Sequence, residues 1–232
     1  MVIKQLYYRG KDMTILNKSI NPYGEPEAAL MGSWPWGATW ELYTGGTRPS
    51  GASTTSAICL LFCESGLVLT KTIKGGWEFT GGRCEMFKKD DFEHAYETIV
   101  REVSEESGAK LLWFKEVGAK VIYNPPGKVC INSESGLPFP SIGFQEYFIG
   151  WCDTPTDKPY GEEVLDSKVV GLADIGHELF SELHEPEELI ILINYFTANT
   201  FKNGNYLPEA LKAFWASNEH YFIQLSEVYN YG

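Results

Sequence analysis

Three glutamates and an arginine lie close together near the middle of the chain, within residues 101–108. Glu102, Glu105 and Glu106 are spaced i, i+3, i+4, so on a helix their carboxylates would lie on one side. Three like charges at this distance repel one another, and Arg101 alone cannot neutralise them. A hard divalent cation that prefers oxygen ligands, Mg²⁺ or Mn²⁺, would do so. The segment therefore predicts either a metal site or a solvated acidic helix face, which is the usual meaning of a charge run.

The residues before these acids predict the helix that carries them. Apolar residues recur at three- and four-residue spacing, which indicates one buried helix face. The predicted helix runs from about Asp91 to Ser107, with Asp90 and Glu93 as a capping-box-like pair and Gly108 as its stop. The residues expected on its buried face are Phe92, Ala95, Tyr96, Ile99, Val100 and Val103.

Glu106 is expected close to the edge of this apolar stripe, at roughly 100° of rotation per residue. A carboxylate there must partly leave water, which is costly unless a cation lies beside it. The position of Glu106 therefore favours the metal site.

The segment from Gly81 to Gly108 resembles the Nudix box, G-x5-E-x7-R-E-U-x-E-E-x-G-U, where U is a bulky aliphatic residue. Residues 101–108 match its second half, and Glu93 stands at the x7 spacing before them. Upstream, residues 77–82 (WEFTGG) are similar to the W-x-F-P-G-G lead-in that is common in the family.

The chain departs from the family pattern at three points. Thr80 stands where proline is frequent, and Ala109 where a bulky aliphatic residue is usual. Gly82 and Glu93 are eleven positions apart instead of six, so about five residues are inserted around Met86 to Asp91.

The resemblance implies an α/β fold, a Nudix-like α/β/α sandwich with a mixed β-sheet. It also implies hydrolysis of a pyrophosphate bond in a nucleoside diphosphate derivative, by attack of water on phosphorus with Mg²⁺ or Mn²⁺ as cofactor. Carried over by position, Glu102, Glu105 and Glu106 would be metal ligands. Glu102 and Glu105 would also be catalytic, together with Arg101, which would orient the glutamates.

A general base is not fixed by the box, and in this family it can come from a loop outside it. Glu163 is the preferred candidate, beside Glu162, just before the last expected strand. Glu146 is a further candidate, and each of the three can instead be an ordinary surface carboxylate.

Four residues before the helix are expected to bind substrate. Gly81 and Gly82 allow close backbone approach and can present N–H groups to an anion. Arg83 can reach a phosphate oxygen or can be a solvated arginine, and Trp77 completes the set.

The composition limits the partners of the chain. Its 232 residues carry a net charge of −12, which argues against a broad nucleic-acid footprint and against an anionic membrane surface. A small nucleotide is the expected partner, with no DNA, RNA or membrane.

The number of cysteines is odd, five, and no two form a C-x-x-C pair. Together with a start that lacks a signal-peptide pattern, this predicts a reducing, cytoplasmic location without a zinc site.

We expect an N-terminal extension over residues 1–50, with a strand and an aromatic-rich loop, and a Nudix domain over residues 51–232 with C-terminal helices in 174–232. Trp34, Trp36 and Trp40 cluster in the extension. They can pack against the main domain, form a lid or a stacking surface for a base, or make a homodimer contact.

Patterning predicts the remaining elements. The expected strands are Val2–Tyr8, Thr55–Cys63, Leu67–Ile73, Trp77–Thr80, Lys110–Lys115, Val117–Tyr123, Gly143–Trp151 and Val164–Leu172. The expected C-terminal helices are Pro186–Ala198 and Leu207–Ser217.

Several functions stay open at this stage. Residues 123–127 (YNPPG) loosely resemble the loop after the box in ADP-sugar pyrophosphatases, and enzymes that remove oxidised nucleoside triphosphates are equal contenders. A non-catalytic Nudix-like sensor joined to a winged-helix tail is the main alternative, although the tail carries few basic residues. An interaction module with a solvated acidic helix and a Nudix isomerase of isoprenoid diphosphates are the others.

Overall fold

The chain divides into two compact units in a computed structural model. The first unit comprises residues 1–57, 83–98 and 118–147, and the second comprises residues 58–82, 99–117 and 148–232. The backbone therefore passes from one unit to the other five times. The structure describes residues 3–8, 11–16, 29–45, 53–73, 76–88, 91–127, 131, 136–155, 159–174, 183, 186–201 and 207–230.

The first unit is built on strands that follow one another in the order β1-β2-β3-β4-β11-β12-β5. Strands β1 and β2, β2 and β3, and β3 and β4 pair antiparallel, and β4 pairs antiparallel with β11. The strands are β1 (Ile3–Tyr8), β2 (Lys11–Leu16), β3 (Leu30–Ser33), β4 (Thr39–Thr44), β5 (Ser53–Cys63), β11 (Leu111–Tyr123) and β12 (Ile142–Cys152). The last three also run into the second unit, because the division falls within them.

A tight turn of sequence Trp-Pro-Trp-Gly joins β3 to β4. Gly37 N donates to Trp34 O at 2.9 Å, and Trp34 N donates to Ala38 O at 2.9 Å. Proline suits the second position of such a turn, and Gly37 has a φ of +99°, which favours glycine. The aromatic-rich loop expected in the N-terminal extension thus contains a β-hairpin.

The inserted residues form a second hairpin in the first unit. Strand β9 (Met86–Lys88) pairs antiparallel with β10 (Asp91–Phe92). The helix predicted from Asp91 therefore begins later, because α1 runs from Ala95 to Glu102. The proposed capping residue Asp90 lies outside the described residues.

The second unit contains the strand order β11-β12-β5-β6-β13. Its further strands are β6 (Gly66–Thr72), β7 (Trp77–Glu78), β8 (Thr80–Arg83), which reaches the division, and β13 (Val164–Val170). Strands β7 and β13 both pair antiparallel with β6, and β8 pairs with β5. The buried run from Cys59 to Cys63 confirms the central strand that the continuous apolar sequence predicts.

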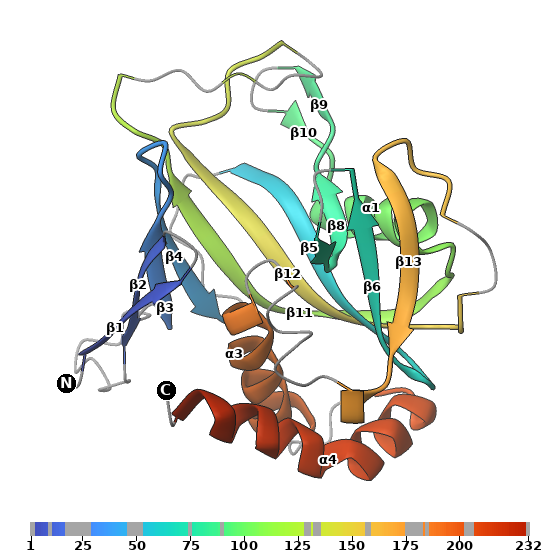
Figure 1. Cartoon of the computed structure of the whole chain (residues 1–232). Coiled ribbons are helices and arrows are strands. Elements are labelled where there is room, and N and C mark those ends of the chain that lie inside the picture. Colours follow the sequence, from blue (N-terminus) through green and yellow to red (C-terminus); the bar gives the residue numbers. More distant parts are fainter. Residues whose placement is uncertain are drawn as a thin grey trace. The chain divides into compact units, whose positions relative to one another are not determined.

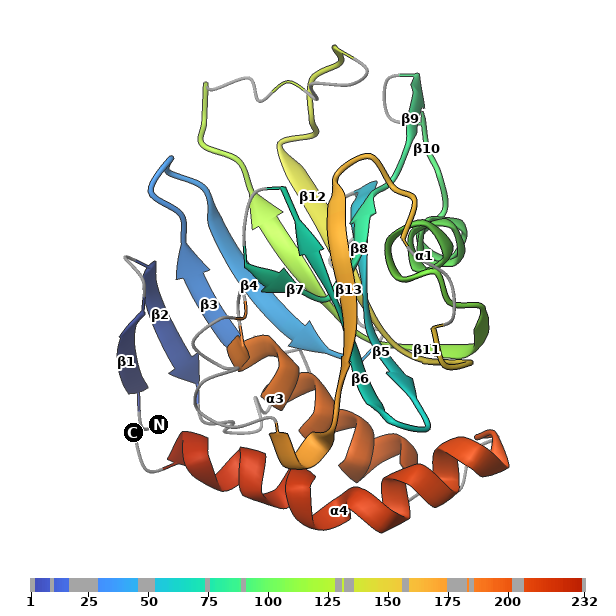
Figure 2. The ribbon, with the colours of Figure 1, turned by 45° about the vertical axis from the view of Figure 1, so that its right-hand side comes forward.

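Two C-terminal helices complete the second unit (Figures 1 and 2). Helix α3 runs from Pro186 to Phe196 and continues as a π-helical turn, Thr197–Phe201, and α4 runs from Glu209 to Asn230. Trp215 of α4 is fully buried, and its ring lies 4.7 Å from that of Phe196 and 5.4 Å from that of Phe62. The C-terminal segment is thus an integral part of the core of this unit.

Other sequence predictions need correction. The two strands expected over residues 110–123 are one continuous strand, β11, because Glu116 and Gly118 do not interrupt the pairing. The strand expected to reach Leu172 ends at Val170, and a short 3-10 turn, Leu172–Asp174, follows. The helix expected to end at Ser217 continues to Asn230.

The α/β class predicted from the sequence is confirmed. Among the residues that the structure describes, no helix is both long enough and apolar enough to span a membrane.

Candidate functional site

The acidic segment changes its helical geometry where the glutamates lie. Glu102 ends α1, and residues Val103–Ser107 form a π-helical turn, η1. Gly108 ends this turn in the left-handed region with a φ of 65°, and its N–H donates to Ser104 O at 3.2 Å. The predicted helix stop at Gly108 is thus confirmed.

The buried face of this helix differs from the predicted one. Tyr96 and Val100 are 49% and 51% exposed, so their assignment to the buried face is wrong. Ile99 and Val103 are fully buried, as predicted. Ala95 is also buried, as predicted, and the polar side chains of Thr98, Glu102 and Glu106 are buried with it.

Glu106 is held in the second unit by the glycine segment before the helix. Its Oε2 accepts a hydrogen bond from Gly81 N at 2.9 Å, and the residue is only 9% exposed. Burial raises the pKa of Glu106 from 4.5 to about 8, and the charges of Glu102 and Glu78 act in the same direction. The Gly81 hydrogen bond lowers the pKa and offsets part of this rise.

Gly82 lies directly against Glu102. A Cβ at position 82 would overlap the carboxylate of Glu102, with Oε1 as its nearest atom. Only glycine leaves that carboxylate in its place, which gives a steric reason for the second glycine of the pair.

Arg101 joins two of the glutamates. Its Nη1 lies 2.8 Å from Glu102 Oε1 and 3.4 Å from Glu105 Oε2. The carboxylates of Glu102 and Glu105 therefore share one guanidinium.

The loop before β13 packs against η1. The carbonyl of Glu105 accepts from Tyr160 N at 2.9 Å and from Gly161 N at 3.1 Å. Glu163 follows two residues later, and its carbonyl accepts from Ile73 N at 2.9 Å. These contacts keep the backbone of the proposed base close to the helix in this unit.

The donor set suits a hard cation, although the side chains are not arranged as a coordination shell. Among the described residues, no three acidic, His or Cys side chains are arranged to hold a metal ion. Glu102 and Glu105 point toward Arg101, whereas Glu106 points toward Gly81. The chemistry still fits, because a divalent cation would stabilise the ionised form of a buried carboxylate such as Glu106, whose pKa is raised by burial and by its acidic neighbours.

Glu78 is a carboxylate of this cluster that the sequence reasoning did not single out. It accepts from Thr72 Oγ1 at 3.2 Å and raises the pKa of Glu106. Its position inside the lead-in, three residues before Gly81, was the signal available in the sequence.

Trp77 already has cationic neighbours in the second unit. Lys168 Nζ lies 3.9 Å from the ring centroid, and Lys71 Nζ lies 5.8 Å from it. A ligand that stacks on Trp77 would have to compete with Lys168.

The other candidate residues lie in the first unit. Arg83 lies over the ring of Phe139 at 5.6 Å and lines a cavity of about 440 Å³. Glu93 accepts from Thr98 Oγ1 at 2.9 Å and from Glu85 N at 3.2 Å, so it supports the base of the β9–β10 hairpin. Glu146 is buried and accepts from Thr54 Oγ1, which favours a structural role over general-base catalysis.

Comparisons with known proteins bear on the fold. No family model matches the chain, and no curated protein matches it in sequence. Among solved structures, the Bacillus subtilis pyrophosphohydrolase BsRppH is similar with a TM-score of 0.54 and 16% identity, over 72% of this chain and 94% of that one. A NUDIX hydrolase from Nitrosomonas europaea is similar at a TM-score of 0.42 and 14% identity, over 63% of this chain and 89% of that one. The first similarity confirms the expectation drawn from the box at the level of the fold, and the chain therefore has the Nudix fold.

Proposed function

We propose that the chain is a metal-dependent pyrophosphohydrolase that cleaves a nucleoside diphosphate derivative, such as a nucleotide sugar, ADP-ribose or a nucleoside triphosphate. The observation that carries this proposal is the burial of Glu106 beside Glu102 and Glu78, with a pKa raised to about 8. A purely solvated acidic face would leave Glu106 in water, where its pKa would stay near 4.5.

Three glutamates would hold the cation, namely Glu102, Glu105 and Glu106. A divalent cation bound there would neutralise phosphate oxygens and lower the pKa of a water molecule. Arg101 would keep Glu102 and Glu105 oriented through its two contacts. The role of Mg²⁺ or Mn²⁺ is a proposal that rests on the oxygen donors alone.

The remaining proposed roles are those of the general base and of the residues that bind phosphate. Glu163 would accept a proton from the attacking water. Gly81 and Gly82 would let the phosphates approach the backbone. Arg83, the next residue along the chain, carries a guanidinium that suits a phosphate oxygen. The cytoplasm is the proposed location, because Cys59, Cys63, Cys84 and Cys152 are free thiols, which are typical of proteins from a reducing compartment.

The test is phosphate or nucleotide release from a substrate panel in Mg²⁺, Mn²⁺ or EDTA. The panel holds ADP-ribose, nucleotide sugars, dinucleoside polyphosphates, and normal and oxidised nucleoside triphosphates. We expect turnover that EDTA abolishes, and that Glu105→Gln and Glu106→Gln each remove while the protein stays folded. Glu209→Gln is the matched control, because Glu209 is an exposed glutamate of α4. Metal binding without turnover on any substrate would favour the non-catalytic sensor instead.

A further inference from the structure

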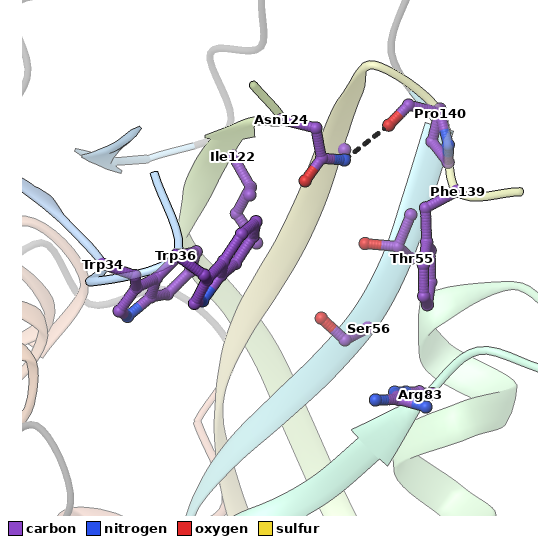
Figure 3. Close-up of a pocket in the computed structure, with 10 residues that line it drawn as sticks. Trp34, Trp36, Thr55, Ser56, Arg83, Ile122, Asn124, Phe139 and Pro140 are labelled. Atoms are coloured by element: carbon purple, nitrogen blue, oxygen red, sulfur yellow. Dashed lines mark hydrogen bonds between the residues drawn. The ribbon is translucent and has the colours of Figure 1, made fainter. Parts of the chain in front are cut away.

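The cavity in the first unit has two aromatic sides (Figure 3). Trp34 and Trp36 form one side, and Phe139 forms the other. The rings of Trp34 and Trp36 are stacked, with centroids 5.4 Å apart and an angle of 12° between their planes. Trp36 is 43% exposed, so part of its side chain faces solvent. We call this space the tryptophan cavity; its lining residues are Trp34, Trp36, Thr55, Ser56, Arg83, Ile122, Asn124, Phe139, Pro140 and Gly143.

Trp34 is held in place by its neighbours. Lys120 is fully buried, and its Nζ lies 5.6 Å from the ring centroid of Trp34 and 4.8 Å from that of Trp40. Trp34 also begins the hairpin turn that Gly37 closes. A platform whose rotamers are held by packing loses little entropy when a flat ligand stacks on it.

The two ends of the cavity differ in chemistry. Asn124 lies at one end, where its Nδ2 donates to Pro140 O at 2.7 Å. Because a carbonyl can only accept, this bond fixes the amide orientation and turns Oδ1 toward the cavity, as Figure 3 shows. Arg83 lies at the other end and supplies a cation. The cavity thus presents an acceptor at one end and a positive charge at the other.

We propose that the tryptophan cavity binds a bicyclic aromatic ring of the purine type that carries an amino group. The ring stacks between Trp36 and Phe139, and its amino group donates to Asn124 Oδ1. The volume of about 440 Å³ accommodates such a ring and part of the group attached to it. The attached phosphates then point toward Arg83; this orientation rests on the proposed function, whereas the ring site itself does not.

The test measures adenosine binding by isothermal titration calorimetry in EDTA. Adenosine has no phosphate, and EDTA prevents metal-dependent turnover, so failure here is distinguishable from failure of the proposed hydrolase. The comparison ligand is purine riboside, which has the same ring but lacks the amino group. We expect adenosine to bind more tightly than purine riboside, by about fivefold or more.

Two variants separate the stacking contact with Trp36 from the hydrogen bond to Asn124. Trp36→Leu should weaken both ligands by about tenfold or more, because it removes the stacking surface. Asn124→Leu should abolish the preference for adenosine over purine riboside and leave purine riboside binding unchanged. Trp113→Leu is the matched control, because Trp113 packs on Phe196 in the second unit and should leave both affinities unchanged.

The proposal is overturned if folded wild-type protein binds neither ligand. It is also overturned if Trp36→Leu binds adenosine as tightly as the wild type, or if the wild type does not distinguish the two ligands. Circular dichroism of each variant verifies that the protein is folded.

Discussion

Gly82 and Glu102 are in such close contact that a single methyl group at position 82 would occupy the place of the Glu102 carboxylate. The atom that must yield is the end of a flexible side chain and not backbone. Changing Gly82 therefore probes the arrangement of the acids with little effect on the fold.

We expect Gly82→Ala to displace Glu102, weaken Mn²⁺ binding by about 10- to 100-fold, and reduce turnover with it. The melting temperature in EDTA should change little. Isothermal titration with Mn²⁺ and a thermal scan measure the two effects. Gly161→Ala is the control, because a Cβ there would lie at an ordinary distance of 3.5 Å from Glu105 O. A large loss of stability without loss of metal affinity would show that the contact serves only packing.

Glu106 should make the stability of the metal-free protein depend on pH. Its folded pKa of about 8 exceeds the ordinary value of 4.5, so the folded state retains a proton that the unfolded chain releases. Stability contributed by Glu106 is therefore fully present below pH 4.5 and falls as the pH rises toward 8. The loss is on the order of a few kcal/mol.

Urea unfolding in EDTA at pH 5 and pH 8.5 tests this effect. Glu106→Gln removes the ionisation and keeps an acceptor for Gly81 N, so the variant should lose less stability than the wild type between the two values. Glu209→Gln should behave as the wild type does. If the free energy of unfolding fell by the same amount between pH 5 and pH 8.5 in the wild type and in Glu106→Gln, the raised pKa of Glu106 would be contradicted.

The β9–β10 hairpin should be dispensable for metal binding. Glu93 N donates to Glu85 O at 2.8 Å, so the two strands are already joined at their base. Replacing residues 86–92 by Asn-Gly, a favoured two-residue hairpin turn, shortens the chain by five residues and restores the usual spacing of the box. We expect Mn²⁺ affinity to stay within about threefold of the wild type; loss of binding in a folded variant would mean that the hairpin residues serve the metal site.

Trp215 should be essential to the second unit. Its ring contacts Phe62, Phe196 and Phe222, and its Nε1 donates to Thr197 Oγ1 at 3.1 Å. Trp215→Ala should cost about 3–5 kcal/mol in the free energy of unfolding, because it leaves a cavity and removes the hydrogen bond to Thr197 Oγ1. Chemical denaturation measures this cost. A change below about 1 kcal/mol would show that α4 contributes little to this core.

The sequence predicts the local structure correctly where a short run of residues alone determines it. The apolar run before Cys63 can only be a buried strand, and Gly108 is the residue type that ends a helix in the left-handed region. The burial of Glu106 follows from its place beside Val103 on one helix face.

The parts that depend on distant partners could not be predicted. Tyr96 and Val100 fit the apolar spacing, yet they are exposed, because Thr98 and Glu102 occupy the buried face instead. Glu78 joins the acidic cluster only because β7 pairs with β6. The tryptophan cavity likewise needs Asn124 and Phe139, which lie far from Trp36 along the chain.

The five passages of the backbone between the two compact units have a consequence for how the gene can change. Neither unit corresponds to a contiguous stretch of coding sequence, so recombination cannot exchange one and keep the other. The box itself is divided, since residues 83–98 belong to the first unit while the glycines before them and the glutamates after them belong to the second. Exchange of one unit as a ready-made module is therefore closed to this chain, whereas substitutions and short insertions, such as the five residues or so inserted around Met86 to Asp91, remain open to it.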